Sequence, residues 1–274
     1  MIYDTFCYFN EDDMLDLRLN YLKDIVDKFI IIEANITFSG LEKKQNFKAE
    51  KYDYLKDKII YVYLENMPES SNPWFYENYQ RNYALEVLKN EKCNDDDIVI
   101  ISDLDEIPSI SAIEEYRANP DGVKALSQNF YNLYLNLFNV SESPWRKAKI
   151  LTYKDFFNQD NKSNGYDMCL VEGANEGISP TSLRLRAFDQ VIQNGGWHFS
   201  YIGDADFVIT KIKSFAHQEF NNEFYLDKER IQNCFKECSD ILARKHSYVK
   251  VDLDHTFPPY ILEKFDQYKK YILD

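Results

Sequence analysis

The sequence predicts an α/β protein with a mostly parallel sheet and helices on its faces. Strand and helix patterns alternate through the first half, and one strand segment, Ile98 to Ile101, consists of four β-branched residues. Such a run is typical of a strand covered on both faces, and strand–helix alternation is typical of a parallel sheet. The 274 residues, 45% of them hydrophobic, suffice for a sizeable core.

The elements of the first half follow from periodicity and from end signals. Apolar residues at helical spacing, with acidic residues in the first turn, predict a helix over Asp12 to Val26. A second helix is expected over Trp74 to Leu88, with Asn72 as the N-cap and Pro73 at the first helical position. Strands are expected at Ile2 to Tyr8, Phe29 to Ile32, Ile59 to Leu64 and Ile98 to Ile101.

After Pro108 the regular alternation ends. A capping box at Ser111 to Glu114 predicts a short helix, and the composition of 158–180 predicts long loops. Further strands are expected at Leu126 to Val140, Leu183 to Phe188 and Trp197 to Ile202, and helices at Asp206 to Phe215, Glu223 to Ala243 and Pro259 to Leu273. Because no clear linker interrupts the chain, we expect a single domain over 1–274.

Composition excludes several classes of partner. With 32 basic and 46 acidic residues the formal net charge is −14 and no basic patch offsets it, so nucleic acid and anionic membrane surfaces are poor partners. No apolar run is long enough for an integral membrane segment, and no export signal is recognisable. The five scattered cysteines fit reduced thiols. These features predict a cytoplasmic protein.

The most informative segment directly follows the buried strand Ile98 to Ile101. If the backbone stays extended, Asp103 and Asp105 point the same way with Cα atoms about 7 Å apart, and Leu104 turns into the core. Two carboxylates facing one space predict a hard divalent ion, Mg²⁺ or Mn²⁺. The chain holds four Asp-x-Asp spacings, so a solvated acidic loop remains the alternative.

A second cluster surrounds His198. Two glycines precede it, and a histidine in an aromatic strand can present neutral imidazole to a metal or an anion. The alternative is a core histidine bonded to a carbonyl group. His217 is the rival candidate, and it fits a helix-terminal residue equally well.

Taken together, these segments resemble glycosyltransferase family 17. The likeness spans most of the chain and is carried by several ordered matches. They are Ile2-Tyr3-Asp4-Thr5-Phe6, Asn10-Glu11, Leu17-Arg18, Val26-Asp27-Lys28-Phe29, Ile32 to Gly40, Asp103-Leu104-Asp105-Glu106-Ile107-Pro108 and Gly196-Trp197-His198-Phe199-Ser200.

The resemblance implies a GT-A-like fold and metal-dependent transfer with inversion, from a nucleotide sugar such as UDP-N-acetylglucosamine (UDP-GlcNAc) to an oligosaccharide or glycoconjugate. Residues 1–108 would form the nucleotide-sugar-binding half, and 109–274 the acceptor-binding and C-terminal helical half. The resemblance makes Asp105 a direct ligand of Mn²⁺ or Mg²⁺. It places Asp103 at the ion through water or at the donor's ribose, and His198 at the ion or the diphosphate.

The resemblance also implies residues that line the donor side of the same crevice. They are Glu11, Arg18, Glu33, Thr37 and Gly40. Arg18 fits a helix residue paired with nearby acids equally well. Arg81 fits either a bidentate contact to the diphosphate or an exposed helix position. Inverting transfer needs a base for the acceptor hydroxyl, for which Glu219 and then Glu176 are the candidates.

Two other functions use the same residues. A nucleotidyltransferase or nucleotide-sugar hydrolase would be favoured by a Gly-rich, Lys-containing phosphate loop near the amino terminus, which is absent. A non-catalytic nucleotide-sugar or glycan-binding relative would be favoured by loss of the site, whereas Asp103, Asp105 and His198 are all present.

Overall fold

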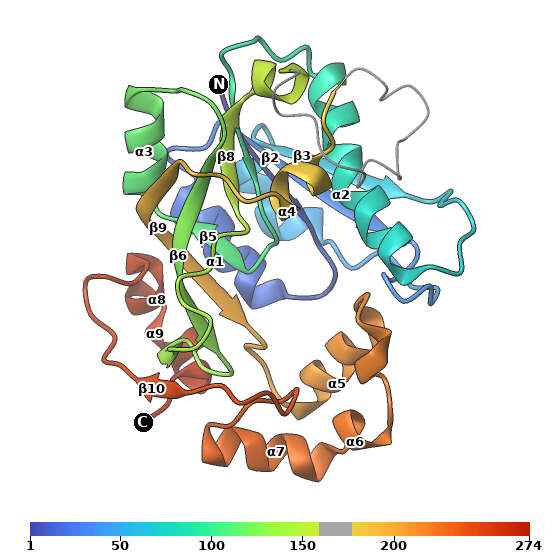
Figure 1. Ribbon diagram of the computed structural model, residues 1–274, viewed down its shortest axis with the longest axis vertical. Coiled ribbons are helices and arrows are strands. Elements are labelled where there is room, and N and C mark those ends of the chain that lie inside the picture. Colours follow the sequence, from blue (N-terminus) through green and yellow to red (C-terminus); the bar gives the residue numbers. More distant parts are fainter. Residues whose placement is uncertain (159–176) are drawn as a thin grey trace.

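The computed structural model describes residues 1–158 and 177–274. Within these residues one mixed sheet runs through the molecule, with the strand order β10-β7-β6-β8-β4-β1-β2-β3, and β9 pairs with both β5 and β6 (Figure 1). The strands are β1 (Ile2–Cys7), β2 (Lys28–Ala34), β3 (Ile59–Leu64), β4 (Ile98–Ile101), β5 (Glu106–Pro108), β6 (Lys124–Asn132), β7 (Leu137–Asn139), β8 (Lys149–Thr152), β9 (Val191–Ser200) and β10 (Tyr248–Lys250).

Helices cover both faces of the sheet, and α5, α6 and α7 lie together at the lower end in Figure 1. The α-helices are α1 (Asp12–Leu22), α2 (Pro73–Asn90), α3 (Ile110–Ala118), α4 (Pro180–Leu185), α5 (Ala205–Ser214), α6 (Glu223–Leu226), α7 (Lys228–Glu237), α8 (Pro259–Glu263) and α9 (Phe265–Tyr268). Short 3₁₀ turns are η1 (Ala49–Leu55), η2 (Tyr153–Phe157), η4 (Gln218–Phe220) and η5 (Lys269–Tyr271). In the described ranges, no helix combines the length and the apolar character needed to cross a membrane.

The first four strands of the chain confirm the predicted parallel sheet. β3, β2, β1 and β4 are neighbours in that order, and every pairing among them is parallel. In β4, Ile98 and Ile100 join the core that includes α1, whereas Val99 and Ile101 join the core that includes α2. Alternate side chains thus bury both faces of the strand, as its β-branched run predicts. The carboxyl ends of these strands meet at one edge, where α/β folds bind ligands.

Several predicted boundaries are confirmed. The strand at Ile59–Leu64 is β3 itself. At the start of α2 the Asn72 side chain accepts a hydrogen bond from the Trp74 amide, and Pro73 is the first helical residue. The first helix ends at Leu22, four residues before its predicted end. The helix after Pro108 is present as α3, but Ser109 caps it instead of Ser111.

Three predictions in the carboxyl-terminal half are wrong. The first three residues of the strand expected at Leu183 to Phe188 belong to helix α4, whose N-cap Ser179 accepts from the Ser182 amide and whose first residue is Pro180. The long helix expected over Glu223 to Ala243 is divided at Asp227, which adopts extended backbone and caps α7 with its side chain. At α4 and α7 a local cap outweighs the apolar periodicity. The helix expected over Pro259 to Leu273 is also divided, into α8, α9 and η5, because the backbone at Lys264 leaves the helical conformation.

Candidate functional site

A turn directly after β4 displays the predicted carboxylates. The Glu106 amide donates to the Asp103 carbonyl oxygen at 3.0 Å, and Leu104 is buried between them, as expected. The extended course expected through Asp105 is wrong, because the turn closes and β5 begins at Glu106, where it pairs with β9. Asp103 and Asp105 therefore contact different neighbours.

Asp103 lies between two guanidinium groups. Its Oδ1 accepts from Arg81 Nη2 at 2.9 Å, and its Oδ2 accepts from Arg184. Burial alone would raise the pKa of Asp103, but the charges of Arg184 and Arg81 outweigh burial and hold that pKa below its usual value. Asp103 is thus an ionised group that orients two cationic side chains.

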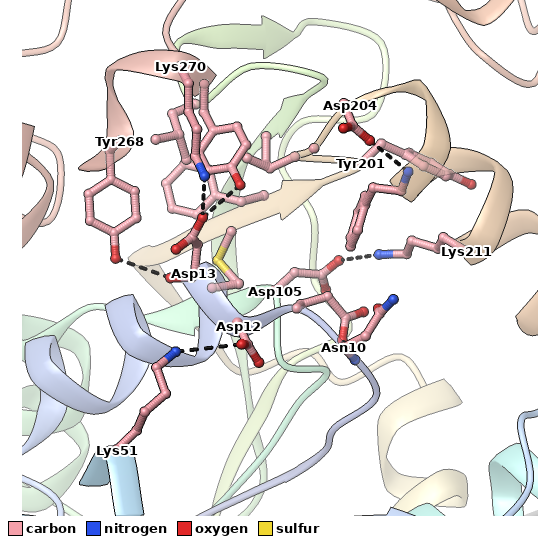
Figure 2. A pocket seen from close by; sticks show the side chains of 18 residues that line it. Asn10, Asp12, Asp13, Lys51, Asp105, Tyr201, Asp204, Lys211, Tyr268 and Lys270 are labelled. Atoms are coloured by element: carbon pink, nitrogen blue, oxygen red, sulfur yellow. Dashed lines mark hydrogen bonds and ion pairs between the residues drawn. The ribbon is translucent and has the colours of Figure 1, made fainter. Parts of the chain in front are cut away.

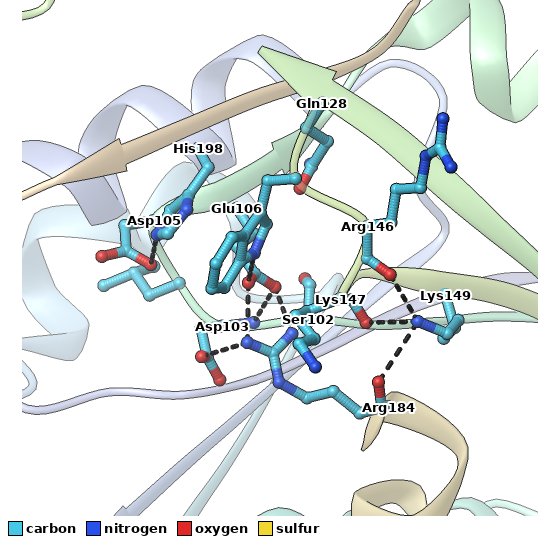
Figure 3. A network of polar contacts seen from close by, with 12 residues as sticks. Ser102, Asp103, Asp105, Glu106, Gln128, Arg146, Lys147, Lys149, Arg184 and His198 are labelled. Atoms are coloured by element: carbon cyan, nitrogen blue, oxygen red, sulfur yellow. Dashed lines mark hydrogen bonds and ion pairs between the residues drawn. The ribbon is translucent and has the colours of Figure 1, made fainter. Parts of the chain in front are cut away.

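Glu106 is fully buried beneath this turn (Figure 3). Its carboxylate accepts from Arg184 Nη2 at 2.6 Å, from the Trp145 indole and from the Asp103 amide at 3.0 Å. Neither Glu106 nor Arg184 was predicted as a site residue. The Ser179-Pro180 pair signals the helix start that carries Arg184, but no local pattern links this helix to β4.

Asp105 meets a second group of side chains. Its Oδ2 lies 3.0 Å from Lys211 Nζ, and its Oδ1 lies 3.6 Å from His198 Nε2. The strand pairing explains the proximity, because Glu106 is in register with His198 and the Phe199 amide donates to the Asp105 carbonyl at 2.8 Å. Lys211 was not predicted, since it lies on α5, far along the chain.

The His198 ring is held between aromatic side chains. Its centroid lies 4.3 Å from that of Phe130 and 4.7 Å from that of Trp145. Burial lowers the pKa of His198, although Asp105 opposes this shift. In the described part of the chain its Nδ1 is buried without a hydrogen-bond partner, and Nε2 is too far from Asp105 for one.

The positions of His198 and Asp105 can be compared with what the predicted metal ion requires. A neutral imidazole with a free lone pair beside a carboxylate fits a divalent ion, which completes its shell with water and substrate oxygens. His198 and Asp105 therefore fit the ion, whereas both oxygens of Asp103 are engaged by arginines. Over residues 1–158 and 177–274, no three His, Cys, Asp or Glu side chains gather in one place to hold a metal.

Arg18 is buried behind the turn that follows β4, where it contacts the backbone of the turn, and it does not face the crevice. Its side chain is fully buried and pairs with Asp4 through two hydrogen bonds, of 2.8 and 2.6 Å. The same guanidinium donates to the carbonyl oxygens of Asp103, Leu104 and Glu106 at 2.8–3.1 Å. This placement matches the alternative interpretation, a helix residue paired with an acid, and makes Arg18 a support for the backbone of the site.

Three other residues expected on the donor side lie at the end of β2 and in the loop that follows it. Glu33 is fully buried and accepts from Lys43, from the amides of Asn46 and Phe47, and from Tyr61. Thr37 and Gly40 form a turn, in which the Gly40 amide donates to the Thr37 carbonyl and Gly40 has a φ of +88°. These residues shape the loop next to α2.

The end of α5 touches the amino-terminal half of the chain. The Ser39 amide donates to the Ser214 carbonyl at 3.0 Å, and the Trp74 and His217 rings lie 4.7 Å apart, edge to face. His217 also bonds Glu219 at 2.7 Å, and the Glu219 side chain is 59% exposed. The first base candidate is therefore a surface carboxylate. Glu176, the second, lies outside the described residues.

The Lys149 side chain connects the segment before β8 to α4, behind the turn that follows β4 (Figure 3). Its Nζ is buried and donates to the carbonyl oxygens of Arg146, Lys147 and Arg184 at 2.6, 3.0 and 3.2 Å. Burial, reinforced by the charge of Arg184, lowers the pKa of Lys149 to about 7. In the unfolded chain a lysine keeps a pKa near 10.4.

This difference predicts a pH dependence of stability. Between about pH 7 and 10 the unfolded chain binds more protons at Lys149 than the folded protein does, so the folded state gains stability as the pH rises. We compare the free energy of unfolding of the wild type with that of the Lys149→Met variant. The difference, wild type minus variant, should increase by up to about 1.4 kcal/mol per pH unit in this range. Urea unfolding across this range measures it, with the exposed Lys245→Met as the control. A difference that stays constant with pH would contradict the assignment.

The fold and the site together define a class of protein. Carboxylates and cationic side chains meet at the carboxyl ends of parallel strands, where α/β enzymes bind phosphorylated and nucleotide-linked ligands. The chain belongs to glycosyltransferase family 17, whose model matches residues 1–175. The resemblance inferred from the motifs and the GT-A-like fold class are thereby confirmed. The matched range ends before Arg184, His198 and Lys211.

Individual relatives extend over more of the chain. It is 24% identical to proteins of Rattus norvegicus and Homo sapiens that are named "Beta-1,4-mannosyl-glycoprotein 4-beta-N-acetylglucosaminyltransferase". A Mus musculus protein of the same name is 23% identical. Each alignment covers 97% of this chain and 53% of the relative. The chain thus spans about half the length of the curated relatives it matches.

Proposed function

We propose that this protein transfers N-acetylglucosamine from UDP-GlcNAc to a glycan acceptor, with a divalent ion and with inversion at the anomeric carbon. The observation that carries the proposal is the meeting of Asp105, His198 and Lys211 at the end of β4. Family membership supports glycosyl transfer, and the names of the relatives support N-acetylglucosamine as the sugar.

The side chains around the turn have distinct roles in this proposal. Asp105 and His198 would hold Mn²⁺ or Mg²⁺, which supplies positive charge against the diphosphate when it is bound. Arg81 and Arg184, already oriented by Asp103, donate hydrogen bonds to phosphate oxygens. Lys211 adds a third cation beside Asp105. Developing negative charge on the leaving diphosphate thus meets fixed positive charge.

The experiment that tests the proposal is a titration of UDP into the protein with Mn²⁺ or with EDTA. We expect tight binding only with the metal, and a loss of at least tenfold in Asp105→Asn. Asp252→Asn is the matched control, because Asp252 belongs to another Asp-x-Asp spacing and is exposed. Incubation with UDP-GlcNAc and glycan acceptors then tests transfer itself.

The outcomes separate the competing functions. UDP binding that persists in EDTA and in Asp105→Asn would reject the metal ligands. Release of UDP without any glycosylated product, across a panel of acceptors, would favour a nucleotide-sugar hydrolase. Binding of UDP-GlcNAc with neither release nor transfer would favour a non-catalytic relative.

A further inference from the structure

A cavity of about 500 Å³ is lined by Asp105 and Lys211, whereas Arg81 and Arg184 are not among its described lining residues. It lies between the amino-terminal end of α1, the connection from β9 to α5, and the residues after α8. Figure 2 shows Asp105 and Lys211 on one side of the cavity and Asp13 and Lys270 on the other. The cavity thus shares Asp105 and Lys211 with the proposed donor site.

The lining of the cavity has the chemistry of a sugar site. Aromatic side chains contribute rings to its wall, among them Tyr201, Phe207 and Tyr268. Rings of this kind pack against the C–H faces of a pyranose, while carboxylates accept hydrogen bonds from its hydroxyl groups. The five carboxylates of the lining outnumber its three ammonium groups, which disfavours a phosphate and favours a neutral sugar.

Most carboxylates in the cavity are already engaged. Asp13 pairs with Lys270 at 2.9 Å and accepts from Tyr271 at 2.7 Å. Asp12 accepts from Tyr8 and lies 3.5 Å from Lys51. Each of these two side chains therefore holds the wall of the cavity together.

Glu11 differs from these two carboxylates. Its Oε2 accepts from the amides of Phe9 and Asn10 at 3.3 and 3.1 Å, which fixes the direction of the side chain. Within the described residues, Glu11 has no ion-pair partner and no hydrogen bond is formed by its Oε1. A fixed carboxylate with an open oxygen thus lines the same cavity as Asp105 and Lys211.

We propose that this cavity binds the acceptor sugar and that Glu11 is the base of the transfer reaction. The inference rests on the proposed function and adds to it the acceptor site and the proton acceptor. The acceptor's hydroxyl oxygen forms a bond to the anomeric carbon, and its proton passes to Glu11. The bond from the anomeric carbon to the phosphate oxygen breaks, and UDP leaves with that electron pair. Glu11 is then a catalytic residue on α1's amino-terminal side. This role replaces the donor-side role that the resemblance implied for Glu11, and it replaces Glu219 and Glu176 as the base.

The cavity is tested without any reaction, by saturation-transfer NMR. The probes are the methyl glycosides of mannose, glucose, galactose and N-acetylglucosamine, each added to the wild type with UDP and Mn²⁺. We expect at least one glycoside to bind, and its signal to fall at least fivefold in Phe207→Ala. Phe265→Ala is the matched control, since Phe265 is a 50% exposed aromatic side chain outside the cavity.

Three results would overturn the cavity assignment. The first is that none of the glycosides binds, and the second is that binding is unchanged in Phe207→Ala. The third is that UDP-GlcNAc displaces a glycoside that stays bound in the presence of UDP alone. The third result would show that the cavity binds the sugar of the donor and not the acceptor. Because this test needs no turnover, it distinguishes a wrong cavity from a wrong proposed function.

Glu11 is tested with Glu11→Gln, which keeps an oxygen for the two amide donors. We expect kcat for transfer to fall at least 100-fold, with the dissociation constant for UDP and the thermal midpoint essentially unchanged. The role of Glu11 as the base would be overturned if kcat of the variant stayed within threefold of the wild type, or if UDP binding weakened while kcat was unchanged. It would also be overturned if the wild type transferred no sugar.

Discussion

Replacing Arg18 with methionine is expected to lower the free energy of unfolding by about 3–5 kcal/mol. Arg18 and Asp4 are both fully buried, so the substitution leaves the Asp4 carboxylate without its cation in a region closed to water. Three carbonyl oxygens of the turn after β4 lose a donor at the same time. Few single substitutions remove so many buried contacts from one point.

Urea unfolding followed by circular dichroism measures this loss. Arg117→Met is the control, because Arg117 is an exposed arginine on α3 and should cost no more than about 0.5 kcal/mol. The double variant Asp4→Leu/Arg18→Met should recover much of the loss, since it removes the unpaired charge as well. A loss below about 1 kcal/mol in the single variant would show that the buried pair contributes little.

The second large effect is expected at Arg184. Arg184→Met removes the cation that contacts both Asp103 and the fully buried Glu106. We expect the free energy of unfolding to fall by about 3–5 kcal/mol, because a buried carboxylate loses its partner. UDP binding in the presence of Mn²⁺ should weaken at least tenfold, since the proposed function gives Arg184 a phosphate contact.

A double variant separates these two roles of Arg184. In Arg184→Met/Glu106→Gln the buried charge is gone, so most of the stability should return. UDP binding should stay weak, because no guanidinium has been restored. If UDP binding recovers together with stability, Arg184 only positions the turn and does not contact the donor. Thermal unfolding and calorimetric titration of the same samples give both quantities.

The sequence was sufficient to predict the amino-terminal half of the fold. The boundaries of β3 match, α2 begins at Pro73, and β4 is buried on both faces. These features depend on local signals, namely β-branched runs, helical spacing and an N-cap. The alternation of strands and helices then restricts the topology to a parallel sheet.

The candidate site was predictable only where a motif that is local in the sequence marks its residues, as at Asp103, Asp105 and His198. Asp103 and Asp105 follow from their place after a buried strand, but their directions do not. The hydrogen bond that closes the turn and the pairing of β5 with β9 fix those directions, and the pairing joins segments far apart along the chain. Arg184 and Lys211 come from helices whose docking no local pattern reveals.

The pairing of β9 also determines when the site can form. The turn after β4 is held by β9, through the register of Glu106 with His198 and through the Phe199 amide on the Asp105 carbonyl. At a synthesis rate of about 5–20 residues per second, the carboxylates leave the ribosome roughly 5–20 s before the strand that fixes them. Meanwhile β6 presents an unpaired edge to other chains. From this order of assembly we expect the nascent chain to be prone to aggregation until β9 docks, and we expect the long-range pairing of β9 to slow folding.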